Sequence, residues 1–346
     1  MDGLAAPHDP FDALRARYLP LVASVTLARA AELLGEASPL AALLRAQLAA
    51  GGKRTRAALA LAVAVALGAD PEAVVPFAAA CEVLHDATLV HDDIEDGDRT
   101  RRGAESAWAR HGLARAINLG DAMMFLAVSL AGTAGAGDAA RLRAVRRLTA
   151  CAMRLAAGQD DDLLARERGA PGDAPTRAAY VATAQGKTGS LLALVLAGAA
   201  ECCGADEAHV EALERVAAEL GVLLQVQDDL VDLYGDKGRG RPGSDLYEGK
   251  PSFLVVCACE RSPPEERAAM LALLARPRGE KRPGDVAALA GWIDRARARE
   301  AAVAQLHATR ERALAASPAR LRRLVAEAAD VILSPARALL ADASAG

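Results

Sequence analysis

The sequence predicts an all-α protein, on three observations. Apolar residues recur at helical spacing over almost the whole chain. No segment alternates apolar and polar residues with the β-branched enrichment that is typical of strands. Alanine and leucine are abundant and aromatic residues make up only 3% of the chain, which favours closely packed helices because Ala and Leu lose little entropy in a helix. We therefore expect one large helical bundle, a single domain spanning 1–346, with 1–10 and 341–346 frayed.

Start and stop signals divide the chain into about ten helices. Asp70-Pro71-Glu72 combines an N-cap, a proline at the first position and an acid at the positive end of the helix dipole. The helix that begins there should run to about Asp96, before Gly97. Gly204 should separate a helix ending near Cys203 from one running through about Tyr234. We expect loops at 235–249 and 278–283.

Composition excludes several classes of protein. The formal net charge of −4 argues against a nucleic-acid surface. The six cysteines show no C-x-x-C pairing and no secretion signal accompanies them, so we expect buried free thiols in a reducing cytoplasm. The longest apolar runs, Ala57–Ala69 and Leu191–Ala200, are too short to span a bilayer. These observations predict a soluble, cytoplasmic protein with no membrane span.

Two carboxylate triplets with identical spacing stand in otherwise apolar helices. They are Asp92, Asp93 and Asp96 in the first, and Asp228, Asp229 and Asp232 in the second. Residues four apart on a helix share a face, and like charges there destabilise the helix unless a cation lies between them. A single triplet is explained equally well as a solvated acidic helix end. Two matching triplets favour a magnesium site, because magnesium prefers oxygen ligands together with water and substrate phosphate. We expect the two triplets to converge in the folded chain.

Dispersed cations complement these acids. Gly51-Gly52-Lys53-Arg54-Thr55-Arg56 places glycines where backbone can approach an anion, with Lys53 and Arg56 in a first helical turn. Arg101-Arg102-Gly103 follows the first triplet, and Lys187, Arg241 and Lys250 lie in the second half. Metal on one side of a diphosphate and Arg or Lys on the other fits this inventory.

At this point the sequence closely resembles the trans-isoprenyl diphosphate synthases, or polyprenyl synthetases, and among them the geranylgeranyl diphosphate synthases. The resemblance runs from about Gly51 to Phe253. It rests on the motifs GGKRTR, HDATLVHDDIEDGDRTRRG, GQDDD, QGKTGS, LLQVQDDLVD and GRPGSDLYEGK, which occur in the family's order and spacing. It implies the isoprenoid synthase type of helical bundle with a central active-site cavity, and a homodimer.

The resemblance also implies roles for individual residues. Asp92 and Asp96 would ligate two magnesium ions on an allylic diphosphate and Asp228 a third, about three Mg²⁺ per active site. Asp93, Asp229 and Asp232 would be supporting ligands or outer-shell acceptors. The allylic diphosphate would be bound by Arg101, Lys187, Arg241 and Lys250, and isopentenyl diphosphate by Lys53, Arg56, His85 and Arg102. The catalytic set would be Lys187, Thr188 and Gln225, with the oxygens of Thr188 and Gln225 easing the developing cation.

Where the family often has lysine, this chain has Arg241, whose delocalised guanidinium is not equivalent to an ammonium point charge. His91, beside the first triplet, is interpreted as a helix-packing histidine in preference to a ligand.

The implied reaction is ionisation of the allylic diphosphate, attack by the double bond of isopentenyl diphosphate, and loss of a proton. If the growing chain lies along the helix that carries Asp92, then Ala87, Thr88 and Leu84 face it. Ala87 and Thr88 are small where short-chain synthases often have aromatic rings. We therefore expect a product beyond farnesyl diphosphate, namely geranylgeranyl diphosphate (C20).

Alternatives remain open at the sequence level. The product could be farnesyl or a longer polyprenyl diphosphate. A class I terpene cyclase also uses an aspartate-rich helix, but has no use for the GGKRTR and RRG segments. A non-catalytic subunit of a heteromeric synthase would be expected to lose metal ligands, whereas this chain keeps all six aspartates. The preferred primer, the pathway served and the oligomeric state are not determined by the sequence.

Overall fold

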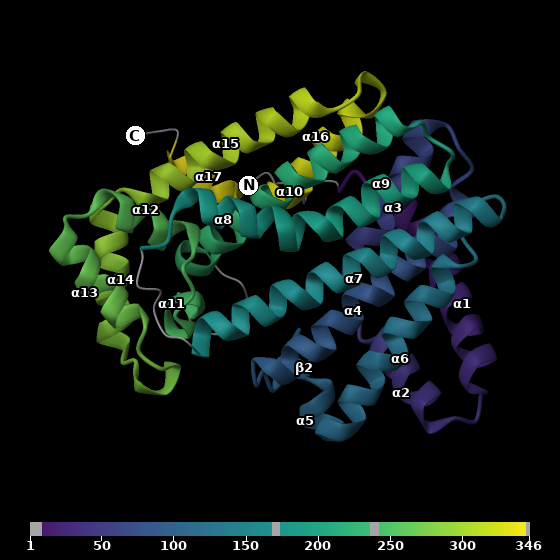
Figure 1. Ribbon diagram of the computed structural model, residues 1–346, viewed down its shortest axis with the longest axis horizontal. Coiled ribbons are helices and arrows are strands. Elements are labelled where there is room, and N and C mark those ends of the chain that lie inside the picture. Colours follow the sequence, from purple (N-terminus) through teal and green to yellow (C-terminus); the bar gives the residue numbers. More distant parts are fainter. Residues whose placement is uncertain (1–8, 168–173, 236–241, 344–346) are drawn as a thin grey trace, which may run out of the picture. The chain divides into compact units, whose positions relative to one another are not determined.

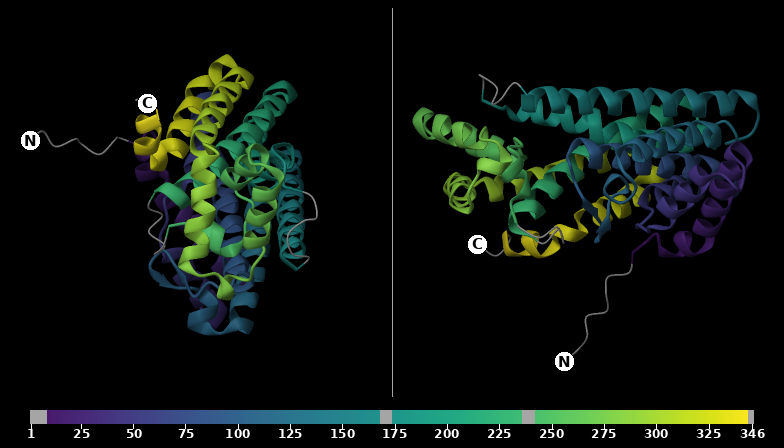
Figure 2. Two further views of the ribbon diagram at one scale, coloured as in Figure 1. Left: turned by 90° about the vertical axis from the view of Figure 1, so that its left-hand side faces the viewer. Right: turned by 90° about the horizontal axis from the view of Figure 1, so that it is seen from below.

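The computed structural model describes residues 9–167, 174–235 and 242–343. Helices account for most of these residues, as Figures 1 and 2 show. The prediction of an all-α fold is confirmed. The described residues divide into more helices than the ten or so predicted, and single turns of 3₁₀ or π geometry lie between several of them.

The chain forms two compact units, and each is described by itself. Unit 1 comprises Met1–Ala152 and Ala193–Leu213, and unit 2 comprises Met153–Leu192 and Glu214–Gly346. The boundaries fall inside three helices, α7 (Asp138–Glu167), α9 (Ser190–Cys202) and α10 (Glu207–Tyr234). That 1–346 is a single domain stays a prediction.

The remaining elements of unit 1 occupy the first part of the chain. They are α1 (Asp12–Leu34), α2 (Pro39–Ala49), α3 (Thr55–Leu67), η1 (Pro71–Val74), α4 (Val75–Glu95), β1 (Thr100–Arg101), β2 (Ala104–Glu105), α5 (Ala107–His111) and α6 (Leu113–Ala131).

The remaining elements of unit 2 lie in the second half. They are α8 (Arg177–Ala184), η2 (Gln185–Gly189), α11 (Ser244–Glu248), α12 (Phe253–Arg261), α13 (Pro264–Leu274), η3 (Arg278–Glu280), α14 (Pro283–Arg295), α15 (Ala298–Ala316), η4 (Ala319–Leu321), α16 (Arg322–Leu333), η5 (Ser334–Ala336) and α17 (Arg337–Ala343). Thus α11 lies in the predicted loop 235–249, and α17 reaches Ala343, within the segment predicted to fray.

Unit 1 is built around α4, which packs against α1, α3 and α6. The side chains of α3 from Ala57 to Ala64 are all buried, and so are most of those of α4. His91 of α4 packs against Gly120 of α6, where an added Cβ would lie 2.1 Å from the imidazole Nε2. His91 thus packs between helices as predicted, and its not being a ligand stays a prediction.

The start of this central helix differs slightly from the prediction. The Asp70 carboxylate accepts a hydrogen bond from the backbone N–H of Glu72 at 3.0 Å, so the predicted cap is present. It begins the 3₁₀ turn η1, and α4 follows directly from Val75 with Pro76 in its first turn. Gly97, with φ of 68°, comes two residues after the end of α4, as expected.

A short β-hairpin follows α4 and was not predicted. β1 and β2 pair antiparallel, with Thr100 opposite Glu105 and Arg101 opposite Ala104. Arg102 and Gly103 form the two-residue turn, with φ of 54° and 79°, as a type I′ turn requires. The strands are too short to produce an alternating pattern, so only the Arg-Gly turn pair could have signalled them. The hairpin sets the positions of Arg101 and Arg102.

In unit 2 the π turn η2 interrupts the helical run between α8 and α9. It lies so close to α10 that a Cβ on Gly221 would be 2.5 Å from the backbone nitrogen of Gly189. Backbone therefore touches backbone at this crossing, which requires glycine. A π turn is often found at functional sites, and this one carries Lys187 and Thr188.

The six cysteines are all free thiols, as predicted, and all but Cys203 are buried. Two stretches of the described chain, Pro71–Glu95 and Leu113–Ala131, are long and apolar enough to cross a membrane by length and composition alone. In the first, 72% of the apolar window is buried inside the protein. This is weak evidence for a span, because the core helix of a soluble protein passes the same test. The absence of a membrane span stays a prediction.

We predict that Gly221→Ala pushes η2 away from α10 and destabilises the fold by roughly 1–3 kcal/mol, the usual cost of overpacking. Urea unfolding of the purified protein measures this. Gly186→Ala is the matched control, because a Cβ on Gly186 of the same turn meets nothing within 4 Å. Equal stability of the two variants would contradict the close approach.

Candidate active site

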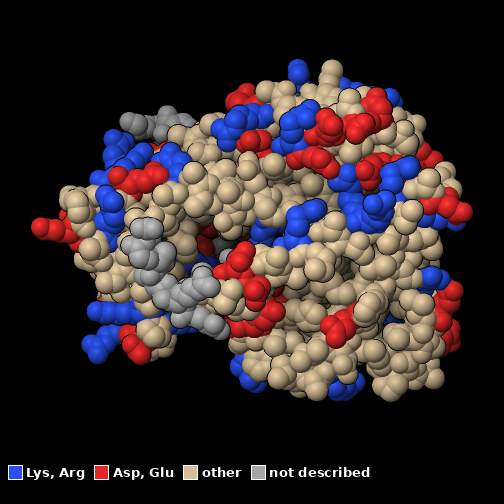
Figure 3. All heavy atoms as spheres, in the orientation of Figure 1, with Lys and Arg blue, Asp and Glu red and all other residues tan. Residues whose placement is uncertain are grey.

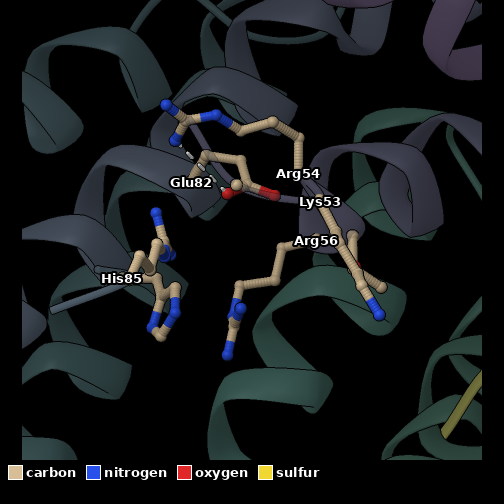
Figure 4. Close-up of a pocket in the computed structure, with 8 residues that line it drawn as sticks. Lys53, Arg54, Arg56, Glu82 and His85 are labelled. Atoms are coloured by element: carbon tan, nitrogen blue, oxygen red, sulfur yellow. Dashed lines mark ion pairs between the residues drawn. The ribbon is translucent and has the colours of Figure 1, made fainter. Parts of the chain in front are cut away.

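Unit 1 contains a cationic pocket of about 210 Å³. Its lining residues come from the start of α3, from α4 and from the hairpin turn: Gly52, Lys53, Arg54, Thr55, Arg56, Glu82, His85 and Arg102. Figure 4 shows Lys53, Arg56 and His85 pointing to the same side, whereas Arg54 turns away across Glu82. The four residues predicted to hold isopentenyl diphosphate, Lys53, Arg56, His85 and Arg102, are therefore brought together.

Glycine backbone makes room for the arginine from the hairpin. Gly52 has φ of 138°, and an added Cβ would lie 2.8 Å from a terminal nitrogen of the Arg102 guanidinium. The same guanidinium donates a hydrogen bond to the carbonyl of Gly51. The GG pair thus positions Arg102 over the first turn of α3, which explains the glycines noted in the sequence.

Arg54 has a structural role that sequence reasoning missed. Its guanidinium forms ion pairs with Asp86 and Glu82, and it donates to the carbonyl of Leu48. Glu82 also accepts the backbone N–H of Ala57 at 2.9 Å, which anchors the start of α3 to α4. These acids are buried within an apolar stretch, and that alone could have suggested a fixed cationic partner.

The electrostatics of the pocket favour an anion. Burial lowers the pKa of His85 well below its usual value, and Arg56, Arg102, Arg101 and Arg54 lower it further. His85 is therefore neutral at pH 7. Burial also lowers the pKa of Arg56, and its Nε is buried without a hydrogen-bond partner in the described residues. A polyanionic ligand would relieve both effects.

The acidic residues of α4 form two neighbouring stripes. Glu82, Asp86 and Asp93 follow one line along the helix and are buried. Asp93 accepts a hydrogen bond from Nε of Arg101 at 2.6 Å and forms an ion pair with Nη2 of the same guanidinium at 2.6 Å. The second line, about 80° round the helix at 100° per residue, carries the half-buried His85, Asp92 and Asp96.

Asp92 and Asp96 lie one turn apart at the C-terminal end of α4. The negative end of the helix dipole is unfavourable for carboxylates, and no basic residue occupies the last turn. Oxygen donors in this situation suit a hard divalent cation. In the part of the chain that the structure describes, no three His, Cys, Asp or Glu side chains gather as a protein-only metal cage.

In the second motif, Asp228 is exposed while Asp229 and Asp232 are buried. Asp229 accepts from the Tyr180 hydroxyl at 2.7 Å, from the backbone N–H of Phe253 and from Gln225. Burial raises the pKa of Asp229 to about 7, and the hydrogen bonds from Phe253 and Tyr180 oppose that rise.

Asp232 accepts from the Ser244 hydroxyl and the backbone N–H of Asp245, which fixes the start of α11. These hydrogen bonds of Asp229 and Asp232 hold neighbouring segments of unit 2 in place, and the supporting metal roles expected of the two carboxylates stay a prediction.

The predicted catalytic residues of unit 2 are connected by hydrogen bonds. Thr188 donates to the Gln225 side-chain oxygen at 3.3 Å, and Gln225 donates to Asp229 at 3.2 Å. Lys187 donates to the Gln159 side chain at 2.8 Å. Tyr180, which orients Asp229, was missed, because nothing in its local sequence marks it.

Other predicted residues are placed less tightly. Lys250 forms ion pairs with Asp245 and Glu248 at the end of α11. Arg241 lies outside the described residues. Ala87 and Leu84 are fully buried on α4, and half-buried Thr88 donates to the carbonyl of His85 at 2.8 Å.

Comparison with known proteins adds the deciding observation. A family model described as polyprenyl synthetase matches residues 38–291, which is most of the chain. The chain belongs to the polyprenyl synthetase family. The matched region includes every predicted site residue from Lys53 to Lys250.

Individual relatives agree with this assignment. The chain is 41% identical over 209 residues to geranylgeranyl diphosphate synthase of Mycobacterium tuberculosis, covering 60% of this chain and 58% of that protein. The structure is similar to polyprenyl synthetase from Streptomyces coelicolor, with a TM-score of 0.80 at 30% identity over 92% of this chain and 98% of that one.

It is also similar to polyprenyl synthase from Caulobacter crescentus complexed with calcium and isoprenyl diphosphate, with a TM-score of 0.77 at 28% identity over 94% of this chain and 96% of that one. The isoprenoid synthase type of fold is therefore confirmed.

We predict that Gly52→Ala displaces Arg102 and weakens binding of inorganic pyrophosphate about tenfold, an effect of about 1.4 kcal/mol. Isothermal titration calorimetry measures the Kd. Gly51→Ala is the control, since that position also has positive φ but a Cβ there meets nothing within 4 Å. If both variants bind alike, Gly52 does not act through Arg102.

Proposed function

We propose that this polyprenyl synthetase condenses isopentenyl diphosphate with an allylic diphosphate, as a magnesium-dependent trans-prenyltransferase. One observation carries the proposal. On a single stripe of α4, His85 faces a cationic pocket, and two turns later Asp92 and Asp96 present carboxylates. Two diphosphates bound in different ways, one by cations and one by metal, suit this arrangement.

The cationic pocket would hold isopentenyl diphosphate. Lys53, Arg56 and Arg102 supply charge, and neutral His85 can donate one N–H to a phosphate oxygen. Its position also fits this role, since a bound anion offsets the arginine charges that depress the pKa of His85. The arginines can bind phosphate oxygens in bidentate fashion.

The carboxylates at the end of α4 would hold magnesium on the allylic diphosphate, with Asp228 adding a further ligand and about three ions in all. Magnesium, when bound, stabilises charge on the leaving diphosphate. Asp93 holds Arg101 in place, so this arginine can contact the same diphosphate. The calcium and isoprenyl diphosphate named for the Caulobacter crescentus structure support this use of the site.

Joint action of Asp92 and Asp228 on one diphosphate stays a prediction. The contacts of Lys187, Arg241 and Lys250 with the allylic diphosphate also stay predictions.

Thr188 and Gln225 would stabilise the allylic cation. Because the Thr188 hydroxyl donates its hydrogen bond to the side-chain oxygen of Gln225, the lone pairs of the hydroxyl oxygen remain available to a developing positive charge. Gln225 is held in turn by Asp229. This chain then needs no nucleophile, and positioning and electrostatics supply most of the rate.

The proposed product is geranylgeranyl diphosphate. Ala87 and Thr88 are small, which leaves space beside α4 for a chain longer than that of farnesyl diphosphate. The name of the Mycobacterium tuberculosis relative supports this length.

A terpene cyclase is disfavoured, because it would have no use for the pocket lined by Lys53, Arg56 and Arg102. A non-catalytic subunit is disfavoured because the carboxylates are retained.

We also propose a cytoplasmic homodimer. Exposed apolar side chains on α6, namely Leu113, Ile117 and Phe125, are more than 40% exposed in the single chain, and such groups are commonly covered by a partner. Elsewhere acidic and basic side chains are interspersed on the face shown in Figure 3, as is usual for a soluble surface.

The activity is tested with purified protein, magnesium, isopentenyl diphosphate and allylic primers of graded length. We expect condensation only when both substrates are present. Consumption of an allylic diphosphate alone would indicate a cyclase, and inactivity without a second protein would indicate a partner subunit.

We predict that Asp92→Asn lowers kcat by about 100-fold or more, because metal stabilisation of the leaving group is worth several kcal/mol. Steady-state kinetics over a range of magnesium concentrations measures the loss. Asp160→Asn is the control, since Asp160 is an exposed carboxylate on α7. Similar rates for the two variants would remove Asp92 from the metal site.

We predict that Ala87→Phe shortens the main product to farnesyl diphosphate, because the ring would fill space beside α4. Chromatography of the dephosphorylated products measures chain length. An unchanged product would show that Ala87 does not face the hydrocarbon.

A further inference from the structure

The structure bears on where the hydrocarbon path ends, a question that rests on the proposed function. Phe77, Cys81, Thr88 and Asp92 lie on one side of α4, within about 60° of one another at 100° per residue, since their spacings of four, seven and four residues are close to whole turns. A chain growing from the diphosphate at Asp92 along this side passes Thr88 and then Cys81. Both side chains are small. Phe77 is the first aromatic residue that it meets.

Three helices of unit 1 converge at this depth. Burial raises the pKa of Cys81 well above its usual value, and the nearby thiols of Cys151 on α7 and Cys202 on α9 raise it further. All three thiols are buried. The small, apolar side chains of these three cysteines therefore lie in the core where α4, α7 and α9 meet.

One turn deeper, the Phe77 ring is wedged against α9. Phe77 is fully buried, and a Cβ added to Gly198 would lie 2.3 Å from its Cζ and 2.8 Å from one Cε. The ring thus occupies the space that any side chain at position 198 would need. It cannot swing toward α9, because helix backbone is already in contact with it.

A buried ion pair lies next to the Phe77 ring. The same added Cβ on Gly198 would lie 3.1 Å from Cδ of Arg147 on α7. The Arg147 guanidinium donates two hydrogen bonds to Glu201 of α9, at 2.8 and 2.7 Å. Both side chains are mostly buried, at 16% and 18% exposure. A hydrocarbon that passed Phe77 would have to desolvate or displace this bidentate pair, which is unfavourable.

The distance agrees with the proposed product. Fifteen residues of α-helix separate Phe77 from Asp92 by about 22 Å, at a rise of about 1.5 Å per residue. Four extended isoprene units, at roughly 5 Å each from carbon–carbon bonds of about 1.5 Å, span about 20 Å. A C20 chain therefore reaches from the diphosphate to the Phe77 ring, and a longer chain does not fit.

We propose that Phe77, seated on Gly198 and supported by the Arg147–Glu201 pair, is the floor of the hydrocarbon path and sets the upper limit of product length. This role differs from that of Ala87 and Thr88, which leave the upper path open. The floor itself is made by contacts among α4, α7 and α9.

Two substitutions with opposite expected effects test the proposal. Phe77→Leu removes the ring but keeps most of the apolar volume, so products longer by one or more isoprene units should appear. Phe77→Ala should increase that fraction. Gly198→Ala adds a methyl group where the ring now lies, which pushes the ring away from α9 and into the path, so products should shorten toward farnesyl diphosphate. Product chromatography with one allylic primer measures all three.

The control is Phe11→Leu, the same change at another buried phenylalanine of unit 1 that lies before α1. It should leave product length unchanged. An unaltered product distribution in Phe77→Leu and Gly198→Ala, with the wild type active, would overturn the floor assignment. Absence of any condensation by the wild type would instead overturn the proposed function, so the two failures are distinguishable.

Discussion

The constraint on which the structure depends is that one helix, α4, is both the centre of the core of unit 1 and the carrier of charged groups. Buried carboxylates in an apolar helix are costly unless they are paired. Glu82 and Asp86 are therefore bound by Arg54, and Asp93 by Arg101. These pairs fix α3 and the β-hairpin to α4. They also leave a neighbouring stripe of the same helix to present His85, Asp92 and Asp96.

The fixed pairs determine what the cationic pocket can do. Because Arg54 is engaged by acids, it helps to shape the pocket without occupying it. Arg102 is held over Gly52 by the hairpin turn. Arg56 projects from the first turn of α3, and Lys53 lies just before that helix, not in its first turn as predicted. Like charges held close together in this way repel one another, and a diphosphate relieves the repulsion. The pocket is thus preorganised for an anion before one binds.

Much of this was accessible from the sequence. The helical periodicity predicts the fold class, and the spacing of Asp92 and Asp96 places both on one face of a helix. The GGKRTR, RRG and D-D-x-x-D motifs led to the family that the comparison confirms. Arg54, Tyr180 and the hairpin were missed, because their roles depend on partners distant in sequence or on strands only two residues long. The single turns of 3₁₀ and π geometry were missed as well, since they are too short to leave a period of their own in the sequence.

The sequence by itself determined which chemical groups this protein has and how they are ordered along each helix, because periodicity and capping are local properties of the chain. Only the tertiary structure decided which of those groups are committed to one another. Nothing local shows that Glu82 and Asp86 are bound by Arg54, or that Phe77 lies on Gly198. Such pairings arise when helices from distant parts of the chain pack, and packing depends on the shapes and charges of both surfaces at once.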